Sequence, residues 1–213
     1  MNTEALIEQL AKDVRPVPRY ARLSRLALGI LAGGAVTLAL ITLVLGVRPD
    51  LTIAMRGAAF WMKWAYTASL GAGALAMTIR LAQPEAVRLS RFWPIAIPFG
   101  LLALVGAVEM SRVPAADWLA MWLGATWKVC PWLVLMLSAP IFAGLLWSFR
   151  RLAPTRLRAA GAAAGFTAGA WAATLYCLHC PEVSAIFVLT WYTLGILLAA
   201  GSGALLGPRV LRW

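Results

Sequence analysis

Long apolar runs separated by short polar segments dominate the chain. Six runs of about the length of a membrane span fit this pattern: residues 26–46, 61–81, 93–110, 129–148, 158–178 and 185–206. An α-helix needs roughly 20 apolar residues to cross a hydrocarbon core of about 30 Å. Prolines inside the third and fourth runs are tolerated, because neighbouring groups in a helix bundle satisfy the freed carbonyls. The pattern predicts an all-α, polytopic membrane protein, built as a bundle of six transmembrane helices.

Composition supports a membrane location. The chain is 62% hydrophobic and 13% charged, whereas a soluble domain carries about 25% charged residues. The first apolar run has full span length and no small-residue cleavage site after it, so we expect it to remain as a helix and not to be removed as a signal peptide.

The net charge of +11 follows the predicted topology. With six spans, fourteen of the 19 lysines and arginines fall on the side that holds both termini, and five fall on the other side. Short loops rich in lysine and arginine stay cytoplasmic. The sequence therefore predicts cytoplasmic N- and C-termini, and the charge needs no direct nucleic-acid partner to explain it.

Residues 1–25 form the only sizeable segment outside the predicted spans. The stretch "TEALIEQLAKDV" predicts a short amphipathic helix, and the prolines of the following "RPVP" end it. Its apolar stripe consists of Leu6, Ile7, Leu10 and Val14. The stripe can lie on lipid or on the bundle, or it can bind a cytoplasmic protein. We predict a cytoplasmic unit at 1–25, a six-helix domain at 26–206 and a short basic cytoplasmic tail at 207–213.

Two further patterns concern packing. The connection 111–128 carries Trp118 and Trp122 one helical turn apart, which predicts an interfacial helix on the outer surface. Glycines four residues apart, in 29–33 and 161–169, let helix backbones approach closely. Such spacing indicates a bundle and is also compatible with a homodimer.

Ionisable side chains inside the predicted spans are few. Lys63, Glu109 and Lys128 fall near the outer ends of their spans, where they can snorkel or pair with one another. The spans carry neither a run of carboxylates across the midplane nor two halves with matched broken segments, which argues against a transporter. The sequence also lacks a phosphate-binding glycine loop and any nucleophile–histidine–acid arrangement, so we expect no enzyme.

The cysteines are the remaining candidates for chemistry. The stretch "LYCLHCPE" holds Cys177, His179, Cys180 and Glu182, and "KVCP" holds Cys130. The predicted topology places all of them at the outer face, where disulfides persist. Thiols with an imidazole and a carboxylate suit zinc, cadmium or copper, and two thiols within reach can form a disulfide. The alternative is that the cysteines are small apolar residues in a helix interface.

Several of these stretches recur together in a known family. They are "LIEQLAKDVRPV", "GVRPDL", "FWMKWAY", "WKVCP" and "LHCPEVSAIFVLTWYTLG". In order and spacing, from about residue 4 to about residue 206, the chain resembles the NrsF family of six-span anti-sigma factors. The resemblance implies a protein of the bacterial inner membrane that holds an extracytoplasmic-function sigma factor through cytoplasmic parts. It also implies release of that partner on an outside signal such as a heavy metal or an oxidant.

By motif, the sensing cysteines that this resemblance implies are Cys130 and Cys180. Cys177 has no clear counterpart in the pattern; Cys177, His179 and Glu182 are accessory ligand candidates. We expect no required cofactor, although a transient soft metal such as zinc or cadmium fits the cysteines. As sigma-factor contacts we predict the N-terminal residues Leu6, Ile7, Leu10, Val14 and Arg15.

The sequence thus predicts an inner-membrane anti-sigma factor, with membrane lipids as its other partner. The alternative is a membrane thiol–disulfide carrier, or a protein that handles or transports heavy metals, in which the cysteines turn over. A cytoplasmic partner of residues 1–25 distinguishes the two, because only the anti-sigma factor requires one.

Overall fold

The computed structural model describes residues 3–12, 21–82, 93–149, 152 and 154–212. All regular structure among these residues is helical, which confirms the all-α prediction. In chain order the elements are α1 (Thr3–Lys12), α2 (Ala21–Leu40) continued by η1 (Ile41–Leu45), α3 (Leu51–Ala54), α4 (Ala58–Leu81), α5 (Ala96–Ser111), η3 (Ala115–Asp117), α6 (Trp118–Leu123), α7 (Cys130–Phe149), α8 (Leu157–Tyr176), α9 (Ala185–Phe187), η4 (Val188–Tyr192) and α10 (Thr193–Val210).

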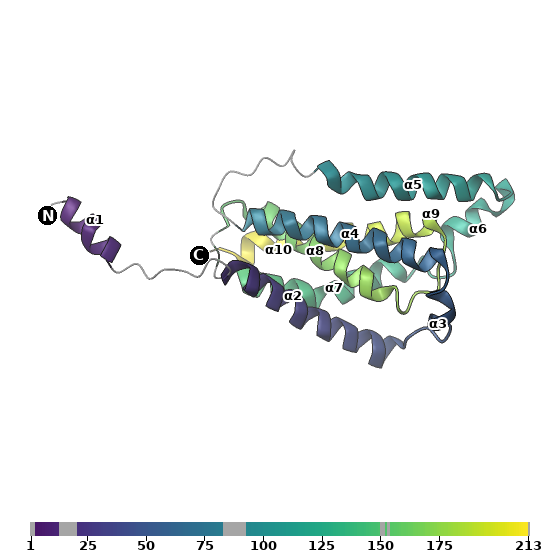
Figure 1. Ribbon diagram of the computed structural model, residues 1–213, viewed down its shortest axis with the longest axis horizontal. Coiled ribbons are helices and arrows are strands. Elements are labelled where there is room, and N and C mark those ends of the chain that lie inside the picture. Colours follow the sequence, from purple (N-terminus) through teal and green to yellow (C-terminus); the bar gives the residue numbers. More distant parts are fainter. Residues whose placement is uncertain (1–2, 13–20, 83–92, 150–151, 153, 213) are drawn as a thin grey trace.

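The long helices α2, α4, α5, α7, α8 and α10 run side by side along the long axis of the molecule (Figure 1). Helix α2 begins and α10 ends at one end, which we call the proximal end. The short helices α3, α6 and α9 lie at the opposite end, which we call the distal end (Figure 1). The chain therefore enters and leaves the bundle at the same end, as an even number of crossings requires.

The prediction of six membrane-crossing helices is wrong for two of the six. Within the described residues, four helical segments are long and apolar enough to cross a membrane: Leu23–Leu45, Trp93–Ser111, Cys130–Phe149 and Ala185–Val210. Helices α4 and α8, which correspond to the predicted spans 61–81 and 158–178, are long enough but less apolar. Helix α4 carries Lys63, and α8 is built largely of alanine and glycine, because it contacts other helices along most of its surface.

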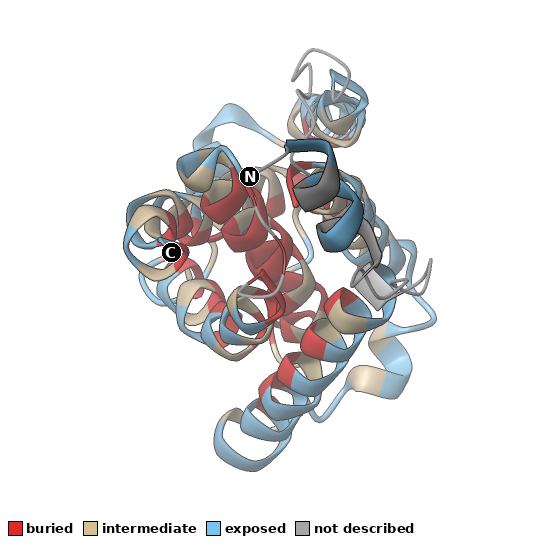
Figure 2. Cartoon of the chain, turned by 90° about the vertical axis from the view of Figure 1, so that its left-hand side faces the viewer, coloured by how far each residue is buried: buried red, intermediate tan, exposed pale blue. Residues whose placement is uncertain are grey.

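Helix α8 lies at the centre of the bundle, where it contacts α4, α7 and α10. The buried residues gather in the middle of the bundle (Figure 2). A side chain at Gly161 would collide with the backbone of Gly203, and one at Gly165 would collide with the backbone of Ala199. Small residues at this spacing let the two helix backbones touch. The close packing that the glycine pattern of 161–169 predicts is confirmed.

The contact between α2 and α7 follows the same rule. A side chain at Gly33 would lie 2.5 Å from the Cα atom of Ile141, and Gly29 faces Gly144 in the same way. The hydroxyl of Thr37 donates a hydrogen bond of 2.9 Å to the carbonyl of Leu137 across this interface. The glycine pattern of 29–33 is therefore also confirmed as a packing motif.

The predicted surface elements are present as helices. The N-terminal helix is α1, in which Ile7 is 62% exposed. Val14, Arg15 and the side chains of Leu6 and Leu10 lie outside the described residues. Within the connection 111–128, η3 and α6 form the predicted helix, and both of its tryptophans are exposed.

Candidate functional site

Three cysteines gather at the distal end of the bundle. Cys130 is the first residue of α7, and Cys177 and Cys180 follow α8. All three are free thiols with 0% exposure. The Cys130 thiol donates a hydrogen bond to the sulfur of Cys180. The structure thus brings together the two cysteines that the sequence predicts as a pair.

Cys177 has a different partner. Its thiol donates a hydrogen bond of 3.3 Å to the carbonyl of Ala173, one turn earlier in its own helix. A cysteine that bonds within its helix behaves as a small buried residue. Cys177 also lies beside Thr67 of α4 and Tyr192 of η4, close to Cys180.

Lys63 of α4 contacts the segment that carries Cys180. Its ammonium donates hydrogen bonds of 2.9 Å to the carbonyls of Cys180 and Glu182. The Lys63 side chain is 1% exposed, and its Nζ lies 5.7 Å from the ring centroid of Tyr192. With 1% exposure the Lys63 side chain does not snorkel to the surface, and among the described residues it pairs with neither Glu109 nor Lys128, so neither of its two predicted roles is seen. Pro181 ends the helical pattern and leaves carbonyls free at this depth, and these carbonyls bind the ammonium.

The loop after η1 holds the same segment from the other side. Arg48 donates a hydrogen bond of 3.3 Å to the carbonyl of Cys180. Its guanidinium also forms a bidentate ion pair with the carboxylate of Asp50, with hydrogen bonds of 2.7 and 2.6 Å. This pair lowers the pKa of the Asp50 carboxyl, chiefly through the hydrogen bonds from Arg48. The ring Nδ1 of His179 lies 2.8 Å from the carbonyl oxygen of Gly46.

Glu182 ties the cysteine segment to the entrance of α7. Its Oε1 accepts hydrogen bonds from the amide of Ala125 at 2.8 Å and from the amide and hydroxyl of Thr126, both at 3.1 Å. Gly124 adopts a φ of 57°, and a side chain there would lie 2.7 Å from Oε2 of Glu182. Only glycine leaves room for the carboxylate and adopts this φ without strain.

The other two charged residues predicted near the outer ends also bind locally. Oε2 of Glu109 accepts a hydrogen bond of 2.8 Å from the amide of Ala185, at the start of α9. Lys128 lies over the ring of Trp127, with 5.6 Å from Nζ to the centroid. Among the described residues, Lys63, Glu109 and Lys128 thus bind other groups and do not pair with one another.

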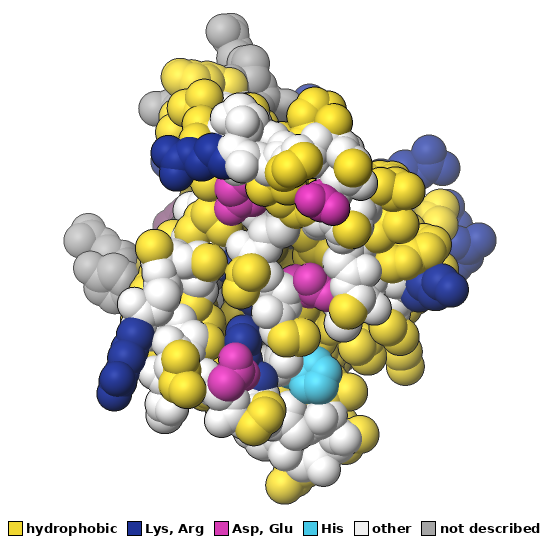
Figure 3. All heavy atoms as spheres, turned by 90° about the vertical axis from the view of Figure 1, so that its right-hand side faces the viewer, with side chains coloured by type: hydrophobic (Ala, Val, Ile, Leu, Met, Phe, Trp, Pro, Cys, Tyr) yellow, Lys and Arg dark blue, Asp and Glu magenta, His cyan; other side chains and the backbone are white. Residues whose placement is uncertain are grey.

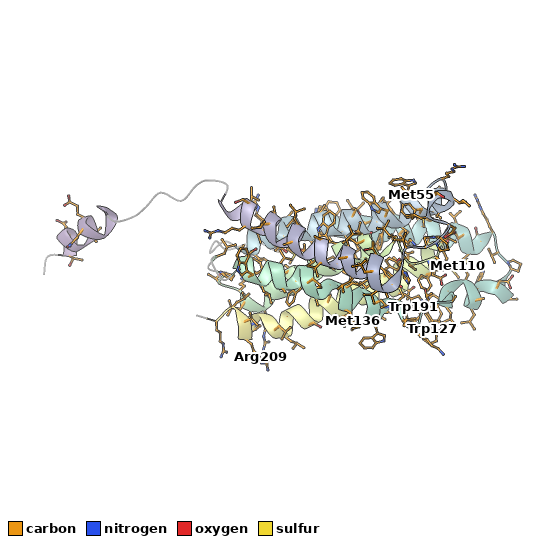
Figure 4. All side chains as sticks on the ribbon, turned by 90° about the horizontal axis from the view of Figure 1, so that it is seen from below. Met55, Met110, Trp127, Met136, Trp191 and Arg209 are labelled. Atoms are coloured by element: carbon orange, nitrogen blue, oxygen red, sulfur yellow. The ribbon has the colours of Figure 1, made fainter. Side chains whose placement is uncertain are left out.

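Aromatic side chains and scattered charges surround the cysteine segment. Trp127 and Trp191 lie against each other at the distal end, with ring centroids 5.3 Å apart (Figure 4). Figure 3 looks onto this end and shows acidic side chains set among hydrophobic ones. The thiols lie beneath this surface: Cys180 is buried, whereas its neighbour Pro181 is exposed.

The described residues form no group of three or more histidine, cysteine, aspartate or glutamate side chains that could hold a metal ion. The predicted accessory ligands explain why. His179 contacts the carbonyl of Gly46, Glu182 binds the segment before α7, and Cys177 bonds within α8. Of the predicted ligand residues, Cys130 and Cys180 are the two whose side chains interact with each other across different elements.

The pair is electrostatically unequal. The pKa of Cys180 is lowered from an ordinary value of 9.0 to about 6, chiefly by the hydrogen bond from the Cys130 thiol and also by the charge of Lys63. The Tyr192 side chain, fully buried beside Cys180, has a hydroxyl without a hydrogen-bond partner among the described oxygen and nitrogen atoms. Two adjacent thiols, one of them acidic, can close a disulfide between the start of α7 and the segment after α8.

Known proteins match this chain over its whole length. The family model described as "Negative regulator of sigma F", NrsF, matches residues 10–213. The chain belongs to the NrsF family. It is 41% identical over 215 residues to the "Probable anti-sigma-F factor NrsF" of Azospira oryzae, and 39% identical over 217 residues to the "Anti-sigma-F factor NrsF" of Caulobacter vibrioides. In both comparisons 100% of each chain is covered. No solved structure matches.

The NrsF match contains every element of the site, since it runs from within α1 to the end of the chain. Contributors that the sequence did not reveal include Arg48, Thr126 and Tyr192. The sequence placed Lys63 at the correct end but did not predict its burial. Arg48 and Lys63 stand in the stretches "GVRPDL" and "FWMKWAY". Those stretches contributed to the family resemblance. They did not show that the side chains of Arg48 and Lys63 both bind the carbonyl of Cys180.

Proposed function

We propose that this chain is a membrane-bound anti-sigma factor that sequesters an extracytoplasmic-function sigma factor and releases it when an oxidant reaches the distal thiols. Its full-length similarity to anti-sigma-F factors supports the binding activity. The direct contact between Cys130 and Cys180 is the single observation that carries the sensing activity.

The proposed location is the bacterial inner membrane, with the distal end in the periplasm and both termini in the cytoplasm. Two facts support this orientation. Fourteen of the 19 basic residues belong to the segments that six crossings would place in the cytoplasm. Helices α4 and α8, although less apolar, run the length of the bundle beside the four candidate spans, and α2 begins at the end where α10 ends (Figure 1). Lysine and arginine in short loops retain those loops in the cytoplasm.

The proposed sigma-factor-binding segment is the N-terminal unit 1–25. The residues proposed to contact the sigma factor are Leu6, Ile7, Leu10, Val14 and Arg15. Its helix is short, and a helix of this length is marginal in water without a partner surface. Ile7 is largely exposed, so its apolar side chain is free to be covered by a bound protein.

The proposed signal is a two-electron oxidation. The thiols of Cys130 and Cys180 lose two protons and two electrons and form one sulfur–sulfur bond, while a hydroperoxide takes up those electrons and protons and is reduced to water and an alcohol or a second water. The new bond joins the start of α7 to the segment after α8. Because α8 contacts α4, α7 and α10, a shift at its end changes the packing of the bundle. Moving the partner from 99% bound to 99% free requires the two states to differ by about 5.5 kcal/mol in affinity.

Co-purification from native membranes tests the binding activity. The full chain is expected to retain a sigma factor, recognised by its peptides in mass spectrometry. A chain without residues 1–25 is expected to lose it while it remains in the membrane. If the full chain retains no sigma factor, the proposal is wrong, whereas a carrier of thiols or metals would show the same result with both chains.

A further inference from the structure

Among the described residues, the buried Lys63 ammonium binds carbonyl oxygens and forms no ion pair with a carboxylate. Its ammonium contacts two carbonyls, and the nearest carboxylate on the same segment, that of Glu182, is bound to Ala125 and Thr126. An isolated buried ammonium costs several kcal/mol, because carbonyl dipoles replace water only in part. A nearby anion would remove most of this cost.

The side chain best placed to supply that anion is Cys180. Lys63 and Arg48 both bind the carbonyl oxygen of Cys180, at 2.9 and 3.3 Å, which places two positive charges close to its sulfur. The side chains of Cys130 and Cys180 lie against each other, so the Cys130 thiol is in place to react with the Cys180 sulfur. The fully buried Tyr192 hydroxyl lies beside the same sulfur.

We propose that Lys63 and Cys180 form an ammonium–thiolate pair in the reduced protein, and that this pair makes Cys180 the first cysteine to react and Cys130 the second. Lys63 is thus a positioning residue for the thiol chemistry. The lowered pKa of Cys180 agrees with this geometry. This pair gives a chemical basis to the proposed sensing function. Its role in releasing a sigma factor rests on that proposed function.

The order of reaction follows from the pair. The Cys180 thiolate attacks one oxygen of hydrogen peroxide, the oxygen–oxygen bond breaks, and hydroxide leaves as the sulfenic acid forms. The Cys130 sulfur then attacks the Cys180 sulfur, the sulfur–oxygen bond breaks, and the Cys130 proton leaves with the hydroxyl group as water. The two sulfurs have lost two electrons to the peroxide, and the thiolate charge is gone. Lys63 is left with carbonyl ligands alone, which weakens its hold on the segment 180–182.

Site-resolved alkylation of the full-length protein in membranes tests the proposal. The reagent is iodoacetamide, which reacts with thiolates, and peptide mass spectrometry reads each cysteine separately as a function of pH. In the wild-type protein Cys180 is expected to react first, with a midpoint near pH 6. In Lys63→Met the midpoint is expected to rise by one unit or more, which lowers the thiolate fraction, and with it the rate at pH 7, by about twofold or more. Lys63→Arg keeps the charge and is expected to restore most of the rate.

Lys128→Met is the matched control, because it removes a lysine at the same end that lies on Trp127 and not on the cysteine segment. It is expected to leave the Cys180 midpoint unchanged. Equal midpoints in wild type and Lys63→Met would overturn the proposal. Should Lys63→Met fail to reach the membrane, the wild type alone decides: alkylation of Cys130 before Cys180, or of both at one rate, contradicts it. The alkylation assay uses neither a sigma factor nor a signal. A negative result would therefore overturn the ammonium–thiolate pair without bearing on the anti-sigma activity. A negative co-purification result would likewise leave the pair unaffected.

Discussion

The interface between α8 and α10 and the distal end of the bundle are held together by different forces. Along the interface, Gly161 and Gly165 place helix backbones in direct contact with Gly203 and Ala199. At the distal end, side chains such as Lys63 hold loop segments by hydrogen bonds to carbonyls and amides. Backbone contact depends only on shape, whereas the distal contacts depend on protonation and on the oxidation state of sulfur.

This difference assigns separate tasks to the two regions. The glycines of this interface carry no group that titrates or oxidises, so their backbone contacts do not depend on pH or on an oxidant. At the distal end, Cys130, Lys63 and Glu109 come from three different helices and all contact one segment, 177–185, whose own Glu182 binds the residues before α7. A chemical change there alters contacts with α4, α5, α7 and the loop 46–50 at once. The following predictions test the contrast, from the largest expected effect to the smallest.

Enlarging a glycine at the α8–α10 interface should have the largest effect. In Gly161→Leu the new side chain collides with the backbone of Gly203, which cannot move without separating the helices. We expect a loss of more than about 3 kcal/mol and little folded protein in the membrane. Yield and thermal unfolding in detergent measure it. Gly201→Leu, on α10 with open space around it, is the control and should remain close to wild type.

The stability of the reduced protein should depend on pH through Cys180. Its pKa is about 6 in the folded chain, below the ordinary 9.0. A lowered pKa means that the unfolded chain binds more protons between these values, so stability rises as pH increases from about 6 to 9 and is lost as pH falls back through 6. The change should be on the order of a few kcal/mol. Cys180→Ser should remove this dependence in pH-resolved unfolding; an unchanged profile would contradict the assignment.

Releasing the carboxylate of Glu182 should have an intermediate effect. Glu182→Ala removes three hydrogen bonds and leaves the amides of Ala125 and Thr126 without this acceptor, at a cost of about 2 kcal/mol. The loosened segment should also expose Cys180 to alkylation more often. Asp117→Ala, at an exposed position of the same end, should change neither quantity. Equal alkylation rates in Glu182→Ala and wild type would show that this carboxylate does not restrain the segment.

A polar contact inside the bundle should matter least. The hydroxyls of Thr78 and Thr167 share a hydrogen bond of 2.9 Å between α4 and α8. Thr78→Val should cost about 0.5–1 kcal/mol, because interhelical hydrogen bonds in membranes contribute about that much. Thr42→Val is the control, since the Thr42 hydroxyl bonds to carbonyls of its own turn. A loss above that of Glu182→Ala would reverse the ranking of the two regions.

Much of the fold was predictable because its causes are local. Apolar runs predict the helices, and glycines four residues apart predict where two of them touch. The span prediction failed for α4, which carries Lys63, and for α8, because the length of an apolar run does not show which helix the others surround. A central helix such as α8 needs small residues more than apolar ones, and these lower its hydropathy.

The site was predictable only in its cysteines. The prolines after Cys130 and Cys180 and the alternating topology place both at one end. The burial of Lys63 was not predictable, because its acceptors are backbone carbonyls whose position depends on the tertiary fold. For the same reason Glu182 resembled a metal ligand in the sequence, although its partners are amides before α7.

The central claim is that the state of the distal thiols controls the hold on a sigma factor at the opposite end. The most direct measurement is the amount of co-purified sigma factor that remains on membranes before and after treatment with hydrogen peroxide, and again after reduction. The wild type and Cys177→Ser should release most of it on oxidation and rebind it on reduction, whereas Cys130→Ser and Cys180→Ser should retain it throughout. Equal release from wild type and Cys180→Ser would contradict the account.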